Sequence, residues 1–163
     1  MLAPPRDRAA ERLKTARLLA LALPVALLGG ALLSQYVGKL YPCEMCWWQR
    51  YPHGVAILLA GAALLSPLNA PRTRALTLLA ALAVAVSGLI GAFHAGVEYG
   101  WWEGITTCST GGAMSLEDIM AVPLIRCDQV QWTLFGLSLA GYNAIFSLGG
   151  AMAIALLARR QSA

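Results

Sequence analysis

Charged residues are scarce in this chain of 163 residues, because Asp, Glu, Lys and Arg make up only 12% of it while hydrophobic residues make up 58%. A water-soluble domain carries about 25% charged residues, so the composition argues against an ordinary soluble globule. The chain also lacks any strict repeat, which excludes a coiled coil and a collagen-like fibre, and its apolar content excludes intrinsic disorder. A membrane protein is the class that remains.

Four runs of the sequence contain no Asp, Glu, Lys or Arg: Leu18–Gly38, Tyr51–Ala70, Ala75–Val97 and Gln129–Ala158. Each run is long enough for the roughly 20 residues that a membrane-spanning helix needs. We therefore predict an all-α fold, an integral membrane four-helix bundle in which residues 1–163 form a single domain. The expected helices cover about 18–37, 51–67, 75–97 and 130–158, and the expected catalytic loops cover 38–50 and 98–129. Pro67, Asn69 and Pro71 predict a short turn between the second and third helices.

Positive charge is concentrated on one side of the expected bundle. The two tails and the turn at 67–74 carry nine of the twelve Lys and Arg residues and two of the eight acidic residues, whereas the opposite side carries three and six. The positive-inside rule then places both termini in the cytoplasm and the loops at 38–50 and 98–129 in the periplasm. No A-x-A-like cleavage site follows the first apolar run, so we expect a retained anchor. The basic residues form no single patch, and we expect no nucleic-acid partner.

The long second loop contains a pattern typical of a short helix. Ser115 and Asp118 fit a capping box, and Pro123 would end the helix. We expect this helix to lie on the membrane surface, where its apolar side is buried. Tryptophans gather near the expected outer ends of the helices, as in an interfacial aromatic belt; they are Trp47, Trp48, Trp101, Trp102 and Trp132.

All four cysteines lie on the predicted outer side: Cys43, Cys46, Cys108 and Cys127. Disulfides persist in an oxidising compartment, so two disulfides are expected, with three possible pairings. They could be structural staples or redox centres. Zinc usually requires a second CxxC pair or nearby histidines, and neither is present near these cysteines in the sequence, so we expect no metal site.

The spacing of Cys43 and Cys46 favours redox chemistry. A CxxC disulfide closes a very small ring, and the motif tends to lower a thiol pKa. The motif precedes a helix, whose N-terminal dipole favours a thiolate. Arg50 follows Cys46 by about one helical turn and is suited to stabilise a thiolate or an anionic acceptor, while Glu44 is expected to point into water. Two cysteine pairs on separate loops indicate a relay by thiol–disulfide exchange. Since no flavin or nicotinamide motif is present, a membrane quinone is the natural electron acceptor.

These residues resemble a known family, the bacterial disulfide bond formation protein DsbB family of four-helix quinone reductases. The likeness covers nearly the whole chain and is carried by Pro42 to His53 (PCEMCWWQRYPH), Gly91 to Glu98 (GAFHAGVE), Cys108, and Cys127 with Gln131 to Ser138 (QWTLFGLS). The resemblance implies a membrane thiol oxidase that reoxidises a periplasmic DsbA-like oxidase with a thioredoxin fold. It also implies that ubiquinone or menaquinone accepts the electrons.

The resemblance also implies a role for each site residue. Cys43 and Cys46 would be the quinone-coupled pair, and Cys46 would contact the quinone beside Arg50. Cys108 and Cys127 would oxidise the soluble partner, with Cys108 receiving its attack and Cys127 then attacking Cys43. His94 would help to line the quinone site, and His53 would be structural. The alternatives are a DsbI-type paralogue with a dedicated partner, a vitamin K epoxide reductase-like enzyme, and a disulfide-stapled membrane scaffold; the early CxxC argues against the second.

Overall fold

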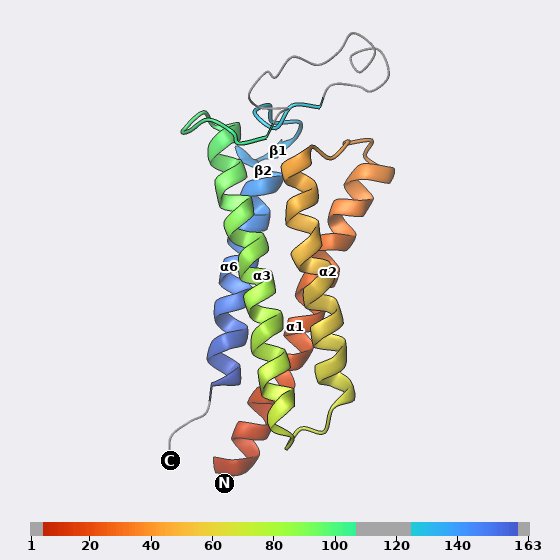
Figure 1. The fold of residues 1–163 in the computed structure, drawn as a ribbon, viewed down its shortest axis with the longest axis vertical. Coiled ribbons are helices and arrows are strands. Elements are labelled where there is room, and N and C mark those ends of the chain that lie inside the picture. Colours follow the sequence, from red (N-terminus) through yellow and green to blue (C-terminus); the bar gives the residue numbers. More distant parts are fainter. Residues whose placement is uncertain (1–4, 107–124, 160–163) are drawn as a thin grey trace.

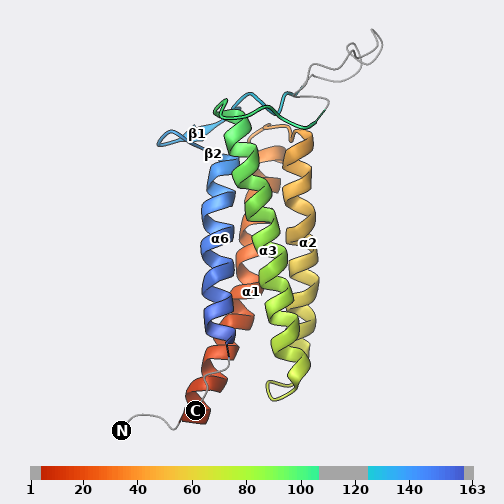
Figure 2. The same ribbon diagram turned by 60° about the vertical axis from the view of Figure 1, so that its left-hand side comes forward.

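The computed structural model describes residues 5–106 and 125–159. Within these residues the chain forms four long helices: α1 (Pro5–Tyr36), α2 (Glu44–Leu65), α3 (Pro71–Glu98) and α6 (Leu139–Ala158). The helices run side by side along the long axis of the molecule (Figure 1, Figure 2). The start of α1 and the end of α6 lie at one end of the bundle, while the start of α2 and a small hairpin lie at the other (Figure 1). The predicted four-helix bundle is confirmed.

Three of the described helices are long and apolar enough to cross a membrane: Arg8–Tyr36, Pro71–Glu98 and Leu139–Ala158. Helix α2 has 22 residues, but its first half carries Gln49, Arg50 and His53. These polar residues lower the mean hydropathy of α2, so it is not among the three helices that are apolar enough to cross a membrane. Their side chains are nevertheless buried within the bundle. Polar residues within membrane bundles usually face inward in this way and mark functional positions.

Helix α1 begins at Pro5 instead of the expected position near residue 18. Two arginines in this basic extension bind helix ends. Arg17 donates hydrogen bonds to the carbonyl oxygens of Leu64 at 2.9 Å and Ser66 at 3.3 Å, and Arg12 donates to that of Leu156 at 2.9 Å. These carbonyls lie at the C-terminal ends of α2 and α6, where orphan acceptors and the helix dipole favour a cation. These contacts hold the extension of α1 against the ends of the other two helices.

Helix α2 also begins earlier than expected, at Glu44 instead of residue 51. Cys43 is its N-cap residue, and the Cys43 sulfur accepts a hydrogen bond from the Cys46 backbone amide at 3.3 Å. Much of the expected loop at 38–50 is therefore helix. As a result, Cys46 lies in the first turn of α2, where the exposed amides of a helix favour negative charge. Helix α3 likewise starts at Pro71, four residues before the expected start.

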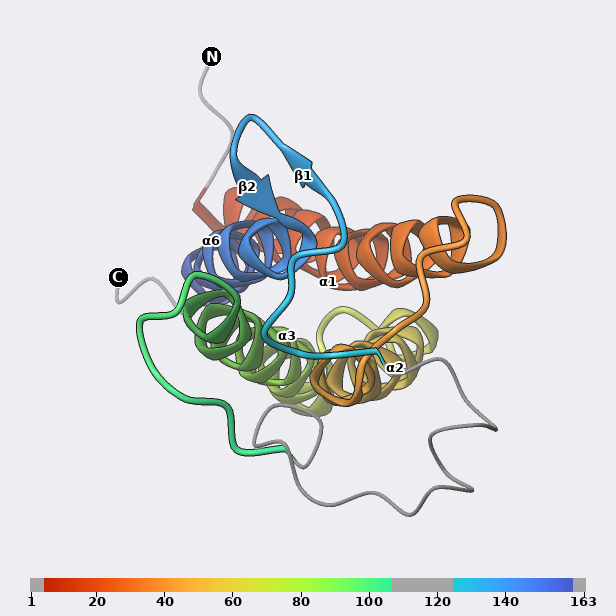
Figure 3. The ribbon, with the colours of Figure 1, turned by 90° about the horizontal axis from the view of Figure 1, so that it is seen from above.

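The expectation of one continuous helix over 130–158 is wrong at its start. Strands β1 (Thr133–Leu134) and β2 (Leu137–Ser138) form an antiparallel hairpin, and α6 begins only at Leu139. The hairpin projects beside the upper end of α6 (Figure 3). Phe135 and Gly136, at the turn, have φ angles of 51° and 78°. Two successive positive φ angles are typical of a tight hairpin turn and are incompatible with a helix. The remaining part of the prediction, α6 itself, is confirmed.

Helices α2, α3 and α6 approach one another closely because small residues line their contacts. At Gly91 an added Cβ atom would meet the Asn143 side-chain nitrogen at 2.9 Å and the Ala140 carbonyl oxygen at 3.0 Å. Alanines fill most of the buried core, including Ala56, Ala60 and Ala80. Small residues let helix backbones pack tightly in membranes. Here they also bring Asn143 of α6 within reach of polar side chains on α2 and α3.

Candidate redox site

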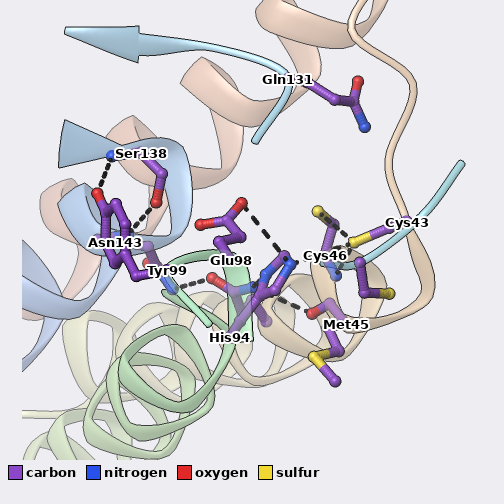
Figure 4. Close-up of polar contacts among 12 residues, drawn as sticks. Cys43, Met45, Cys46, His94, Glu98, Tyr99, Gln131, Ser138 and Asn143 are labelled. Carbon is purple, nitrogen blue, oxygen red and sulfur yellow. Dashed lines mark hydrogen bonds and ion pairs between the residues drawn. The ribbon is translucent and has the colours of Figure 1, made fainter. Parts of the chain in front are cut away.

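The CxxC motif lies at the upper end of the bundle, where Cys43 caps α2 and Cys46 occupies its first turn. The two sulfur atoms are 2.9 Å apart and both residues are free thiols. A disulfide requires about 2.05 Å between sulfurs, so a small side-chain adjustment would close or open the bond. Figure 4 shows the two cysteines side by side, with His94 and Glu98 approaching from α3.

Cys127 belongs to the same buried cluster as Cys43, together with Met45 and Val97. The Thr106 hydroxyl donates a hydrogen bond to the Cys127 sulfur at 3.4 Å. The structure thus brings Cys43, Cys46 and Cys127 together, although Cys127 is far from the CxxC motif in the sequence. Cys108 lies outside the described residues, as does the expected surface helix that begins near Ser115.

The Cys43 and Cys127 thiols differ in acidity because they share a hydrogen bond. The pKa of Cys127 is lowered to about 6, chiefly by the hydrogen bond from the Cys43 thiol and further by a backbone contact with Met45 and by the Thr106 hydroxyl. The pKa of Cys43 is raised, first by hydrogen bonding to Cys127 and then by that to Cys46 and by burial. The lowered pKa makes Cys127 the more readily ionised, and so the more nucleophilic, thiol of this pair.

This difference predicts how alkylation of Cys127 depends on pH in the fully reduced protein. A thiolate reacts and a thiol does not, so the rate should fall as the pH drops through about 6. An unperturbed cysteine would lose reactivity near pH 8.5, at about its ordinary pKa. The measurement is iodoacetamide labelling at a series of pH values, with Cys127 identified by peptide mass spectrometry. Cys43→Ala removes the donated hydrogen bond and should move the midpoint upward; an unchanged midpoint would contradict this cause.

Arg50 provides a buried positive charge near the thiols. Its guanidinium, in a residue that is 9% exposed, donates to the side-chain oxygen of Gln35 and to the carbonyl oxygen of Ala31 at 3.2 Å, both on α1. It also lies 4.9 Å from the centre of the Trp47 ring. Within residues 5–106 and 125–159 no carboxylate pairs with this cation. An uncompensated buried cation favours a bound anion or an electron-rich oxygen.

His94 and Glu98 lie one helical turn apart near the end of α3. The His94 Nε2 atom is 3.5 Å from the Cys43 sulfur and 3.8 Å from one Glu98 carboxylate oxygen. The other Glu98 oxygen is buried and has no hydrogen-bond partner in the described part of the chain. The sequence analysis did not predict Glu98 as a site residue. It could have done so, because an acidic residue at the end of an apolar helix, one turn from a predicted site histidine, often marks a functional position.

The ligand atoms of Cys43, Cys46 and His94 lie within 4.8 Å of one another, close enough to consider a metal. In a tetrahedral zinc site, bonds of about 2.3 Å to sulfur would separate two sulfurs by about 3.8 Å. The sulfurs here are 2.9 Å apart. This separation fits a dithiol that is about to become a disulfide better than it fits two zinc ligands.

The site opens into a cavity of about 280 Å³. Its volume is close to the lower end of the range for small-molecule pockets. One wall is formed by apolar residues of α1, including Ala26, Leu27 and Ala31. The polar residues that face them from other parts of the site include Cys43, Cys46, Arg50, His94, Glu98 and Asn143. The predicted partners Cys46, Arg50 and His94 therefore share one cavity.

The structure also locates Glu44, His53 and four of the five tryptophans that the sequence analysis singled out. Glu44 is exposed, as expected. Trp47, Trp101, Trp102 and Trp132 are exposed near the upper helix ends. His53 is buried and hydrogen-bonded to Asn143 at 2.9 Å. The sequence analysis also did not predict Gln49 and Asn143 as site residues. Each is a polar amide in a largely apolar helix, a pattern that often marks a functional position.

A membrane helix bundle with a CxxC pair beside a third, buried cysteine is suited to form and exchange disulfides. Comparison with known proteins agrees: the family model for disulfide bond formation protein DsbB matches residues 13–157, and the chain belongs to this family. It is accordingly a disulfide oxidoreductase of the membrane.

Three curated relatives match most of the chain. Disulfide bond formation protein B of Verminephrobacter eiseniae is 32% identical over 149 residues, which cover 83% of this chain and 80% of the relative. The protein of the same name from Hahella chejuensis is 31% identical, covering 76% and 79%. An uncharacterized protein of Rickettsia prowazekii is 23% identical, covering 85% and 83%. No solved structure matches the chain significantly.

Proposed function

We propose that this protein is a thiol oxidase of the bacterial inner membrane. It reoxidises a periplasmic DsbA-like oxidase with a thioredoxin fold and passes the electrons through two cysteine pairs to a membrane quinone. The observation that carries this proposal is that Cys43 and Cys46 line one cavity with Arg50 and His94, while Cys127 packs against Cys43. Family membership supports the disulfide chemistry.

The relay consists of thiol–disulfide exchanges, each of which forms one S–S bond and breaks another. A thiolate of the partner attacks Cys108 in a Cys108–Cys127 disulfide, and the electron pair of the broken bond leaves on Cys127. Cys127 then attacks Cys43 in the Cys43–Cys46 disulfide, and the pair leaves on Cys46. The lowered pKa of Cys127 supports both its departure and its attack. Its burial beside Cys43 supports the direction of the second step.

Ubiquinone or menaquinone, when bound, would accept two electrons and two protons and become a quinol. Cys46, Arg50 and His94 would hold the head group, since all three line the cavity. Arg50 fits this role because its charge has no carboxylate partner among the described residues, so it can stabilise a quinone oxygen as negative charge develops. The apolar wall from α1 suits a ring that arrives from the lipid and excludes water from the thiols.

The same proposal places the site on the periplasmic side and both termini in the cytoplasm. The start of α1 and the end of α6 lie together, at the end of the bundle opposite the start of α2 (Figure 1), which Cys43 caps. That end carries Arg12 and Arg17, in agreement with the positive-inside rule. An oxidising compartment at the opposite end is where disulfides persist.

The test is quinone reduction by the purified protein in detergent. A short-chain quinone and a reduced thioredoxin-fold oxidase are added, and quinone absorbance is followed for the wild type, Cys46→Ser and Cys108→Ser. We expect both variants to lose turnover, because each removes one end of the relay. Ser66→Ala, at the opposite end of α2, controls for general effects of substitution.

Unchanged reduction in Cys46→Ser would refute this mechanism. Absence of turnover in a folded wild type would favour the disulfide-stapled scaffold, in which the cysteines only stabilise the loops. Turnover with only one of several oxidases offered would favour a DsbI-type role with a dedicated partner.

A further inference from the structure

We propose that Gln49 and Asn143 are positioning residues that hold His94 as the neutral tautomer with its proton on Nε2, directed at the Cys43 sulfur. The tautomer follows from hydrogen-bond geometry alone. Its role in disulfide exchange rests on the proposed function.

The orientation of the Gln49 amide is set by a backbone carbonyl. The Gln49 nitrogen lies 3.1 Å from the Met45 carbonyl oxygen, which can only accept a hydrogen bond. The same nitrogen lies 2.8 Å from Nδ1 of His94. An amide nitrogen donates and cannot accept, so Nδ1 must be the acceptor. A histidine whose Nδ1 accepts is neutral and carries its proton on Nε2.

Asn143 prevents the Gln49 amide from turning over. The Asn143 nitrogen donates to the Gln49 side-chain oxygen at 2.9 Å and to the Ser87 carbonyl oxygen at 3.2 Å. The second contact again involves an acceptor-only group, so the orientation of Asn143 is also defined. Its own oxygen accepts from the Ser147 hydroxyl at 2.9 Å. Two carbonyl oxygens thus orient the two amides, and the amides orient His94.

Burial makes this arrangement costly to rearrange. Gln49 is 7% exposed and His94 is 2% exposed, so turning either group would leave buried donors and acceptors unpaired. The contacts join α2, α3 and α6, and Gly91 leaves the space that Asn143 occupies. The other charged or titratable groups of the same cavity are Tyr41, Cys43, Cys46, Arg50, His53, Glu98, Arg126 and Tyr142; Cys127 packs against Cys43.

The Nε2 proton faces the Cys43 sulfur, a Glu98 oxygen and the backbone of Cys127, with which the His94 ring also forms a hydrogen bond. Nε2 lies 3.5 Å from the Cys43 sulfur and 3.8 Å from a Glu98 oxygen. When a thiolate attacks Cys127 in a Cys43–Cys127 disulfide, a new S–S bond forms at Cys127 and the electron pair of the broken bond leaves on Cys43. A hydrogen-bond donor directed at Cys43 stabilises that negative charge as it develops.

The chain contains only two histidines, His53 and His94, which makes the tautomer directly measurable. The full chain is labelled with ¹⁵N-histidine in detergent, and long-range ¹H–¹⁵N spectra show which ring nitrogen carries the proton. His94→Asn identifies the His94 signals by their loss. We expect the wild type to have a proton on Nε2 and none on Nδ1.

Gln49→Glu replaces the donating nitrogen by an oxygen and should put a proton on Nδ1. Gln49→Met removes the contact without adding charge and should leave both tautomers populated. Ser147→Ala is the matched control, because it removes one hydrogen bond to Asn143 but neither carbonyl contact; it should keep the wild-type tautomer. A proton on Nδ1 in the wild type, or a bare Nδ1 in Gln49→Glu, would overturn the proposal.

The second readout is the opening of a Cys43–Cys127 disulfide by dithiothreitol in chains that also carry Cys46→Ser and Cys108→Ser. We expect Gln49→Glu and Gln49→Met to slow the opening by about tenfold, as for the loss of one hydrogen bond to a developing charge. Equal rates would refute the role of the tautomer. Neither readout uses a quinone, so failure of the proposed electron acceptor and failure of this inference are distinguishable.

Discussion

A variant that keeps only Cys43 and Cys127, made by Cys46→Ser and Cys108→Ser, is expected to form one disulfide between these residues in nearly every molecule. The two thiols share a buried cluster, and the pKa of Cys127 is lowered while that of Cys43 is raised. Oxidation therefore needs no rearrangement of the helices. Blocking free thiols before digestion and mapping the linked peptides by mass spectrometry measures the yield.

The matched control keeps Cys46 and Cys127 instead, through Cys43→Ser and Cys108→Ser. Cys46 is only partly buried at the edge of this cluster, and the hydrogen bond that lowers the pKa of Cys127 comes from Cys43. We expect a much lower yield from this pair. Equal yields from the two variants would mean that the site does not direct Cys127 toward Cys43, which would remove the geometric basis for the relay.

Arg50→Met is expected to lower kcat/KM for quinone by about 100-fold, the usual cost of losing one group that stabilises developing charge. The buried cation has no carboxylate partner among the described residues and lines the same cavity as Cys46. Arg50→Lys keeps the charge but loses the planar fork that contacts α1, so it should retain an intermediate rate. The measurement is quinone absorbance at varied quinone concentration, with reduced oxidase in excess.

Gln35→Leu is the control for stability, because it removes one of the two hydrogen bonds from Arg50 to α1 but keeps the charge. We expect a far smaller loss of kcat/KM than in Arg50→Met. If Gln35→Leu lost as much activity as Arg50→Met, Arg50 would act by joining α1 to α2, and its proposed role at the quinone would be wrong.

Much of this site could be expected from local patterns. The CxxC spacing identified Cys43 and Cys46, and the helical repeat placed Arg50 one turn further along. By contrast, Gln49 and His94 are 45 residues apart, and Asn143 and Gln49 are 94 apart. No local sequence pattern predicts that the Gln49 amide will contact the His94 ring, because this contact depends on how closely three helices approach one another.

The boundaries of the helices show the same division. The apolar runs predicted α1, α3 and α6, since each must satisfy its backbone hydrogen bonds within a lipid environment. The early start of α2 depends on the Cys43 cap, and the hairpin before α6 depends on two positive φ angles at Phe135 and Gly136. An uncharged run of sequence is compatible with either a helix or a hairpin, so composition alone extended the last helix too far.

The sequence by itself determined a membrane helix bundle with a CxxC pair at one end, because apolar length, charge distribution and CxxC spacing are properties of neighbouring residues. Tertiary structure alone decided that Cys127 lies beside Cys43, that the Arg50 charge remains uncompensated among the described residues, and that two amides orient His94. The physical reason is that thiol acidity and histidine tautomer depend on hydrogen bonds between distant segments. Those bonds exist only when the helices are packed.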